Sequence, residues 1–123
     1  MSKETWIGKS VLRKDAWEKV SGKAQYIADL HPDNMNFGVI YRSPHHHAKI
    51  LNMDTNAARQ IDGVLRIITH KDVPGNLNYG AIVPDRPILA VDKVRFTGEP
   101  VAIVVAKTQA AAEKARKAIE VTY

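Results

Sequence analysis

The chain has 123 residues, 45% of them hydrophobic and 25% charged, a composition that predicts one globular domain and excludes a disordered chain. The absence of cysteine excludes disulfides, thiolate zinc sites and iron–sulfur clusters held by this chain, and it fits a cytoplasmic protein. The formal net charge is +5, but Lys and Arg are spread among Asp and Glu, which favours a solvated basic surface over a nucleic-acid site.

The first third of the chain predicts a polar arm followed by one helix and two strands. We expect an N-terminal arm at 1–9. DAWEKVSG at 15–22 predicts a short helix that Asp15 caps and Gly22 ends. KAQYIADL at 23–30 predicts a short strand. MNFGVIYR at 35–42 alternates apolar and polar residues, which predicts a strand with Phe37, Val39 and Tyr41 on one face.

The middle of the chain mixes strands, a helix and a long loop. AKILNMD at 48–54 predicts a strand, and TNAARQID at 55–62 a short helix with Asp54 or Thr55 as its cap. GVLRIIT at 63–69 is apolar and β-branched, which predicts another strand. THKD at 69–72 has the form of a capping box and predicts one helical turn. Residues 74–87 are rich in Gly, Pro and Asn and predict the longest loop.

The last third contains the clearest strand and the clearest helix. ILAVDKVRF at 88–96 predicts a turn and a short strand. VAIVVA at 101–106 is apolar throughout, which predicts a central strand covered on both faces, and it is far shorter than the roughly 20 residues of a membrane helix. Residues 108–119 predict a helix that Thr108 caps, with a Glu113–Lys117 pair. EVTY predicts a final strand, and the irregular mixture favours an α+β fold.

Three consecutive histidines, His45 to His47, suggest a metal site. In an extended segment His45 and His47 share one face and His46 points to the other, so a strand supplies two ligands at most. Zinc usually takes three or four protein ligands, each with a supporting group behind it. We therefore favour surface or capping histidines over metal ligands, and a subunit interface is a further alternative.

The serines carry no sign of nucleophilic catalysis. Ser10, Ser21 and Ser43 lack the G-x-S-x-G elbow that exposes a reactive hydroxyl. The glycine-containing stretch PGNLNYG at 74–80 lacks the spacing of a phosphate-binding loop, so we expect an ordinary surface loop there.

The carboxylates between positions 85 and 99, and the GEPVA segment at 98–102, each allow a functional or a structural interpretation. Asp85, Asp92 and Glu99 fall in or beside loops, and we favour surface positions for them over a general acid–base pair. In GEPVA, Gly98 permits an unusual backbone angle and Pro100 fixes the next one, which predicts the structural start of a central strand.

Five segments in this order resemble the N-terminal region of the large, molybdopterin-binding subunit of the xanthine dehydrogenase and aldehyde oxidase family, which includes carbon-monoxide dehydrogenase. They are KVSGKAQYIADL, YRSPHHHAKILNMDT, DGVLRIITHKDVPG, DKVRFTGEPVAIVVAKT and AAEKARKAIEVTY. The resemblance covers residues 8 to 123. It implies an α/β-hammerhead domain at 10–123, an α+β fold with a mixed sheet and packed helices, behind the arm at 1–9.

The resemblance also implies a place in a larger enzyme. Members of the family are molybdenum-dependent hydroxylases that oxidise aldehydes or N-heterocycles with oxygen taken from water. They use molybdopterin-bound molybdenum, iron–sulfur clusters and FAD, and their catalytic and cofactor residues lie beyond this domain. We therefore assign no catalytic, cofactor-binding or metal-binding residue to this chain, and we expect no cofactor to be bound by it.

The expected partners are the remainder of the large molybdopterin subunit, in the same chain or encoded separately, and the iron–sulfur and FAD subunits. Neither a membrane nor a nucleic acid is expected among them. Two other interpretations stay open: a free-standing binding module for an acidic partner or nucleic acid, and a small hydrolase or metalloprotein that the motifs disfavour.

The family pattern also bears on the histidines. It is approximately R-S-x-x-x-H-A-x-I in this segment, and the matching residues are Arg42, Ser43, His47, Ala48 and Ile50. His45 and His46 are then local variation, and the triple histidine is incidental.

Overall fold

The structure is a computed structural model that describes residues 7–123. Its contacts divide the chain after Asp33 into two compact units, and each is described here by itself. Most of the arm expected at 1–9 lies outside the described residues. No helix among residues 7–123 is long and apolar enough to cross a membrane.

The first unit contains helix α1 (Ala16–Val20), as the sequence predicts, but its expected cap is different. Asp15 occupies the N-cap position without a capping hydrogen bond. Its carboxylate instead lies 3.0 Å from Lys19 Nζ and 2.5 Å from Arg13 Nε. Lys19 and then Arg13 lower the pKa of Asp15, because both stabilise the charged carboxylate.

The prediction of a strand at 23–30 is wrong. Residues Ile27–Asp29 form a 3₁₀ helix, η1, and the Asp29 carboxylate accepts a hydrogen bond of 2.9 Å from the backbone N–H of Tyr26. This local side-chain bond satisfies the backbone without a neighbouring strand, which is how short polar side chains compete with sheet formation.

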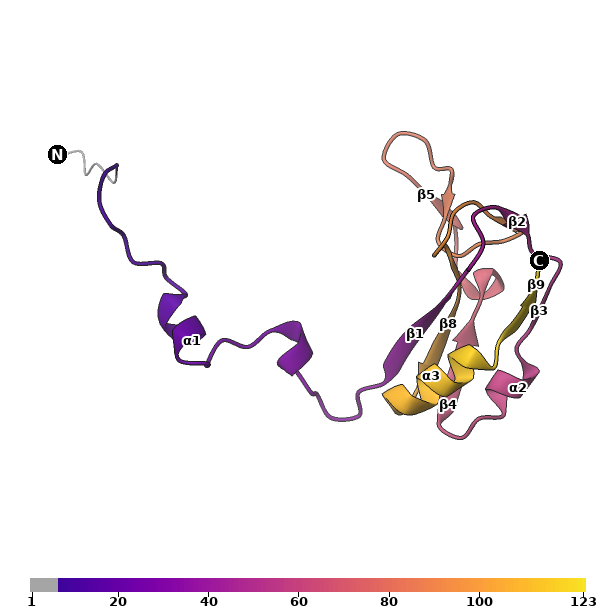
Figure 1. The fold of residues 1–123 in the computed structure, drawn as a ribbon, viewed down its shortest axis with the longest axis horizontal. Coiled ribbons are helices and arrows are strands. Elements are labelled where there is room, and N and C mark those ends of the chain that lie inside the picture. The colour runs from indigo at the N-terminus through magenta and orange to yellow at the C-terminus, as the bar shows by residue number, and fades with distance from the viewer. Residues whose placement is uncertain (1–6) are drawn as a thin grey trace. The chain divides into compact units, whose positions relative to one another are not determined.

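The second unit is built on a three-stranded antiparallel sheet in the order β1-β8-β4 (Figure 1). β1 is Phe37–Arg42, β8 is Pro100–Ala106 and β4 is Val64–Ile68. The register pairs Val39 with Val104 and Val104 with Ile67. The prediction that VAIVVA forms the central strand is confirmed.

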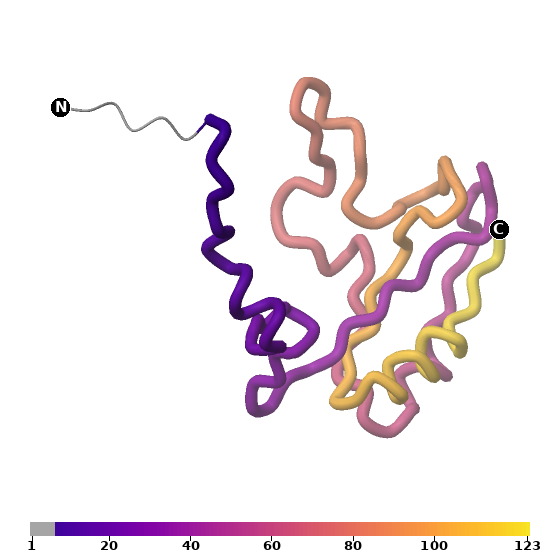
Figure 2. The backbone as a smooth tube through the Cα atoms, turned by 60° about the vertical axis from the view of Figure 1, so that its left-hand side comes forward, coloured from indigo at the N-terminus to yellow at the C-terminus, as the bar shows by residue number. Residues whose placement is uncertain are grey.

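Helix α3 (Gln109–Lys117) covers one face of this sheet, and Figures 1 and 2 both show it lying against the strands. Thr108 caps it as predicted, since its Oγ1 accepts a hydrogen bond of 3.2 Å from the N–H of Ala111. Ala112 and Ala115 are completely buried between helix and sheet. Glu113, however, bonds Arg116 at 2.9 Å instead of the expected Lys117.

The side chains of β8 are buried to different degrees on its two faces. On the α3 face, Ala102, Val104 and Ala106 are all completely buried. Val101 is also completely buried, but it lies at the register shift opposite Tyr41 and Arg42, where it packs with Ala90 and Val94. On the other face, Ile103 and Val105 are only half-buried. The expected complete cover is therefore confirmed for the α3 face alone.

Three pairs of short strands surround the sheet, and all are antiparallel. β2 (Ala48–Lys49) pairs with β7 (Lys93–Val94), β3 (Asn52–Asp54) with β9 (Glu120–Thr122), and β5 (Asn78–Tyr79) with β6 (Arg86–Pro87). Figure 1 shows β3 and β9 side by side. The last pair forms a hairpin inside the loop expected at 74–87.

The single strand predicted at 48–54 is interrupted between β2 and β3. The N–H of Ile50 bonds the carbonyl of Asp92 at 2.9 Å, whereas the N–H of Leu51 bonds the carbonyl of Thr122 at 2.8 Å. The chain thus changes partner at this point, from the segment around β7 to the segment around β9. Such an exchange depends on tertiary neighbours and has no local sequence signal.

Two short helical segments begin near the predicted caps. Thr55 occupies the N-cap position of α2 (Asn56–Arg59) without a capping side-chain bond, and Oδ1 of the preceding Asp54 accepts a bond of 2.8 Å from the N–H of Asn56. The 3₁₀ helix η2 (His70–Asp72) carries the capping box of Thr69 and Asp72. Hydrogen bonding from the Thr69 N–H, and then from Arg66, lowers the pKa of the Asp72 carboxyl. With these elements the α+β prediction is confirmed.

Candidate functional site

The end of β1 and the start of β8 are joined by a dense set of hydrogen bonds. Ser43 N–H donates to Glu99 O at 3.0 Å, and Gly98 N–H donates to Ser43 O at 2.8 Å. The Arg42 guanidinium adds a bond of 2.8 Å to Gly98 O. Gly98 has φ +90°, which only glycine adopts without strain. The predicted role of GEPVA as the start of the central strand is thereby confirmed.

Glu99 is the buried carboxylate of this junction, with 3% of its surface exposed. Its Oε2 accepts a hydrogen bond from the backbone N–H of Arg95, and its Oε1 lies 3.7 Å from Arg95 Nη1. The surface position expected for Glu99 is wrong, although it is right for Asp85 and Asp92. A buried carboxylate that is paired in this way fixes the loop before β8, because separating the partners leaves an uncompensated charge.

The histidines lie in a bend after β1 and not in the extended segment that the sequence suggested. All three are exposed. His46 Nδ1 lies 3.0 Å from Thr97 Oγ1, and the His45 ring packs edge-on against Tyr123 with centroids 4.6 Å apart. Among residues 7–123, no three His, Asp or Glu side chains come close enough together to hold a metal ion.

The candidate serine hydroxyls take part in local turns. Ser43 is buried, and its Oγ accepts a bond of 3.1 Å from the N–H of His45 and donates one of 3.4 Å to that residue's carbonyl. Ser21 donates to the carbonyl of Glu18 at 3.3 Å, and Ser10 is exposed. None of these contacts is a base that could activate a nucleophile.

Tyr41 and Tyr123 meet beside this junction. Burial, together with the neighbouring Tyr123 hydroxyl, raises the pKa of Tyr41 from 10.0 to about 12. The hydroxyl oxygen of Tyr123 is buried and has no hydrogen-bond partner among the described residues. The two rings therefore contribute packing here, and Tyr41 stays protonated at neutral pH.

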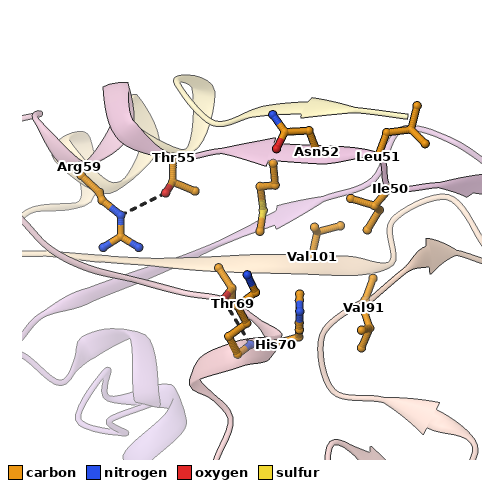
Figure 3. Close-up of a pocket in the computed structure, with 12 residues that line it drawn as sticks. Ile50, Leu51, Asn52, Thr55, Arg59, Thr69, His70, Val91 and Val101 are labelled. Carbon is orange, nitrogen blue, oxygen red and sulfur yellow. Dashed lines mark hydrogen bonds between the residues drawn. The ribbon is translucent and has the colours of Figure 1, made fainter.

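A pocket of about 390 Å³ lies between β3, α2, η2 and β8. Figure 3 shows Arg59 and Thr55 at one end of it and Leu51 and Val91 at the other. His70 also lines it, and the His70 Nδ1 atom is buried without a partner among residues 7–123. Its lining contains Arg and Lys but no carboxylate. This chemistry suits an acidic group, and sequence reasoning missed it because the cations come from separate segments.

A second pocket, of about 500 Å³, lies between the hairpin β5–β6 and the loop before β8. It brings together Asp85 and Glu99, two of the carboxylates whose sequence positions raised the possibility of an acid–base pair. Arg86 and Arg95 line it too, so its charges are balanced, and Arg95 already pairs with Glu99. The structure thus favours an ion-paired surface hollow over an acid–base pair.

Comparison with known proteins agrees with this description. A family model described as aldehyde oxidase and xanthine dehydrogenase, a/b hammerhead domain, matches residues 21–123. A probable xanthine dehydrogenase subunit from Bacillus subtilis is 40% identical over 93% of this chain and 15% of its own length. The nicotinate dehydrogenase large molybdopterin subunit of Eubacterium barkeri is 37% identical over 95% of this chain and 28% of its own.

A solved structure leads to the same conclusion. Quinoline 2-oxidoreductase from Pseudomonas putida 86 has a TM-score of 0.85 and 37% sequence identity, over 98% of this chain and 16% of its own. The chain therefore spans less than a third of each of these relatives. It belongs to the aldehyde oxidase and xanthine dehydrogenase family of molybdenum hydroxylases, in which it matches the a/b hammerhead domain.

Proposed function

We propose that residues 10–123 are a structural and assembly domain of a molybdenum-dependent hydroxylase and do not carry out its chemistry. The observation that supports this most is the junction between β1 and β8. There the chemically versatile side chains, Ser43, Glu99 and Arg42, are all used to hold backbone segments together. The small share of each relative that the chain spans agrees with such a domain-level role.

The complete enzyme, in this proposal, oxidises aldehydes or N-heterocycles with oxygen from water. Molybdopterin-bound molybdenum supplies the redox chemistry, and iron–sulfur clusters and FAD carry the electrons away. The chain has no cysteine to ligate an iron–sulfur cluster, and residues 7–123 bring no three His, Asp or Glu together to hold a metal ion. In this proposal the cofactors are bound by other parts of a cytoplasmic enzyme.

The experiment compares assembly with turnover in the enzyme isolated from its source. Glu99→Gln is introduced into the native gene, with the exposed Asp85→Asn as the matched control. A structural role predicts less assembled enzyme for Glu99→Gln, but unchanged turnover per bound molybdenum. Lower turnover per molybdenum at normal assembly would contradict the proposal, because it would place Glu99 in the chemistry.

A second candidate is a free-standing module for an acidic partner, and the cationic pocket in Figure 3 favours it. In that case Arg59→Gln together with Lys71→Gln abolishes partner binding. Enzyme assembly then does not depend on this chain at all, which separates the two candidates.

A further inference from the structure

The pocket of Figure 3 is lined by two cations that no carboxylate of the described chain neutralises. Arg59 donates from Nε to Thr55 Oγ1 at 3.1 Å, the bond drawn in Figure 3, and its two terminal nitrogens have no partner among residues 7–123. The Lys71 ammonium likewise makes no hydrogen bond or ion pair within that range. Both side chains are exposed. A cavity lined by charge of one sign concentrates ions of the opposite sign, so this one attracts an anion.

His70 adds a neutral hydrogen-bond donor to the same lining. Its Nδ1 atom is buried and has no partner among the described residues, so a proton on Nδ1 would be a buried donor without an acceptor. This favours the tautomer with the proton on Nε2, the ring nitrogen that is not buried. The pocket then offers a guanidinium, an ammonium and an imidazole N–H, and every one of these groups donates to an oxyanion.

The opposite end of the pocket is apolar. Figure 3 shows Ile50 and Val91 there, far along the pocket from Arg59, and Val101 of β8 between the two ends. Val91 is 38% exposed, so it lies at the rim. The volume of about 390 Å³ falls within the roughly 300–1,000 Å³ of small-molecule sites, which combine apolar walls with a few polar groups. The complementary ligand is therefore a small molecule with an anionic group and an apolar body.

We propose that this pocket binds a small organic phosphate, with the phosphate at Arg59 and Lys71 and the apolar part against Ile50 and Val101. A phosphate monoester carries a charge of about −1.5 to −2 at neutral pH and three acceptor oxygens, which suits two cations and a further donor better than the single charge of a carboxylate. A cavity with apolar walls favours a small molecule over an acidic polypeptide. The inference goes beyond the proposed function, because the site does not depend on which polypeptides accompany the chain.

The first test is calorimetric titration of the native protein, isolated with every polypeptide that accompanies the chain. Phenyl phosphate is the probe, and inorganic phosphate and phenol each represent one half of it. We expect phenyl phosphate to bind at least tenfold more tightly than either half. Arg59→Gln and Lys71→Gln should each weaken its binding at least tenfold, without lowering the melting temperature, because both residues are exposed. Lys117→Gln removes the same charge from the exposed side of α3, and binding should stay within twofold of the parent.

The second test separates the two ends of the pocket. Val91→Asp places a charge at the apolar rim, so it should weaken phenyl phosphate at least tenfold and leave inorganic phosphate within twofold. Equal affinity of the parent and Arg59→Gln for phenyl phosphate overturns the inference, as does failure of the native protein to bind this probe at millimolar concentration. Release of an accompanying polypeptide by Arg59→Gln also overturns it, because the pocket then holds an acidic segment of a protein.

Discussion

The two faces of β8 differ in a way that hydrophobicity alone does not explain. The face under α3 carries two alanines and a valine, all completely buried, whereas the opposite face carries Ile103 and Val105, which are larger or equal in size and only half-buried. Small residues on the strand meet small residues on the helix, Ala112 and Ala115, so the backbones approach closely. What decides burial is therefore the element that packs on each face.

The largest effect should come from a charge on the covered face. Val104→Asp puts a carboxylate without a partner among completely buried residues. Leaving a charge uncompensated in the interior costs several kcal/mol, against a total stability of about 5–15 kcal/mol, so we expect the domain to unfold. Circular dichroism and urea unfolding would measure this.

The control for this change is its neighbour on the other face. Val105→Asp makes the same replacement of Val by Asp, one residue further along the same strand, but here the half-buried side chain can reach water. We expect a stable fold with a lower urea midpoint. Equal unfolding by the two variants would mean that the two faces of β8 are equally closed.

The next largest effect concerns the helix that covers the sheet. Ala115 is completely buried, so Ala115→Glu crowds the close contact between α3 and the strands and adds a charge. Overpacking alone costs about 1–3 kcal/mol. Lys114→Glu, one residue earlier and exposed, should change the free energy of unfolding by less than about 0.5 kcal/mol. Similar losses in both variants would contradict the packing of α3 described here.

The features that sequence reasoning predicted correctly are local ones. The continuous apolar character of VAIVVA identified the central strand, and Thr108 identified the start of α3. The strand predicted at 23–30 failed because an Asp29 side chain satisfies the backbone of Tyr26 in a 3₁₀ turn. The half-open face of β8 was missed for a different reason, since a pattern of apolar residues does not reveal which neighbours are present.

At the candidate site, too, the local features were predicted correctly and the features that depend on tertiary neighbours were missed. Gly98 and its neighbours were recognised as a structural turn, because an unusual backbone angle has a direct sequence signal. Glu99 was placed on the surface, since loops usually expose carboxylates, and its burial depends on pairing with Arg95. The Arg95–Glu99 spacing of four residues was a possible signal. The pocket of Figure 3 had none, because its cations come from α2 and η2.

A pH titration sharpens the comparison at the edge of the covered face. Tyr41, which pairs with Ala102, has its pKa raised to about 12 by burial. Its folded pKa lies above the ordinary value of 10.0, so its contribution to stability is complete below pH 10 and is lost as the pH rises through 12. Absorbance at 295 nm should show a phase near pH 12 that Tyr41→Phe removes.

The control for the titration is Tyr79→Phe, at a position 57% exposed in β5. This change should leave the phase near pH 12 in place. Loss of that phase in Tyr79→Phe, or its survival in Tyr41→Phe, would show that the covered face does not enclose Tyr41.

The smallest effect is expected outside both faces, in the histidine bend. His45 and His46 are exposed, and each makes one side-chain contact, with Tyr123 and Thr97. Replacing both by Ala should change the free energy of unfolding by no more than about 0.5 kcal/mol, with or without a chelator. Ser43→Ala is the control and should cost more, roughly 0.5–1.5 kcal/mol, because its buried hydroxyl accepts from the N–H of His45. A loss of several degrees in the melting temperature of the parent chain on adding chelator would contradict this, since it would mean that the bend holds a structural metal ion.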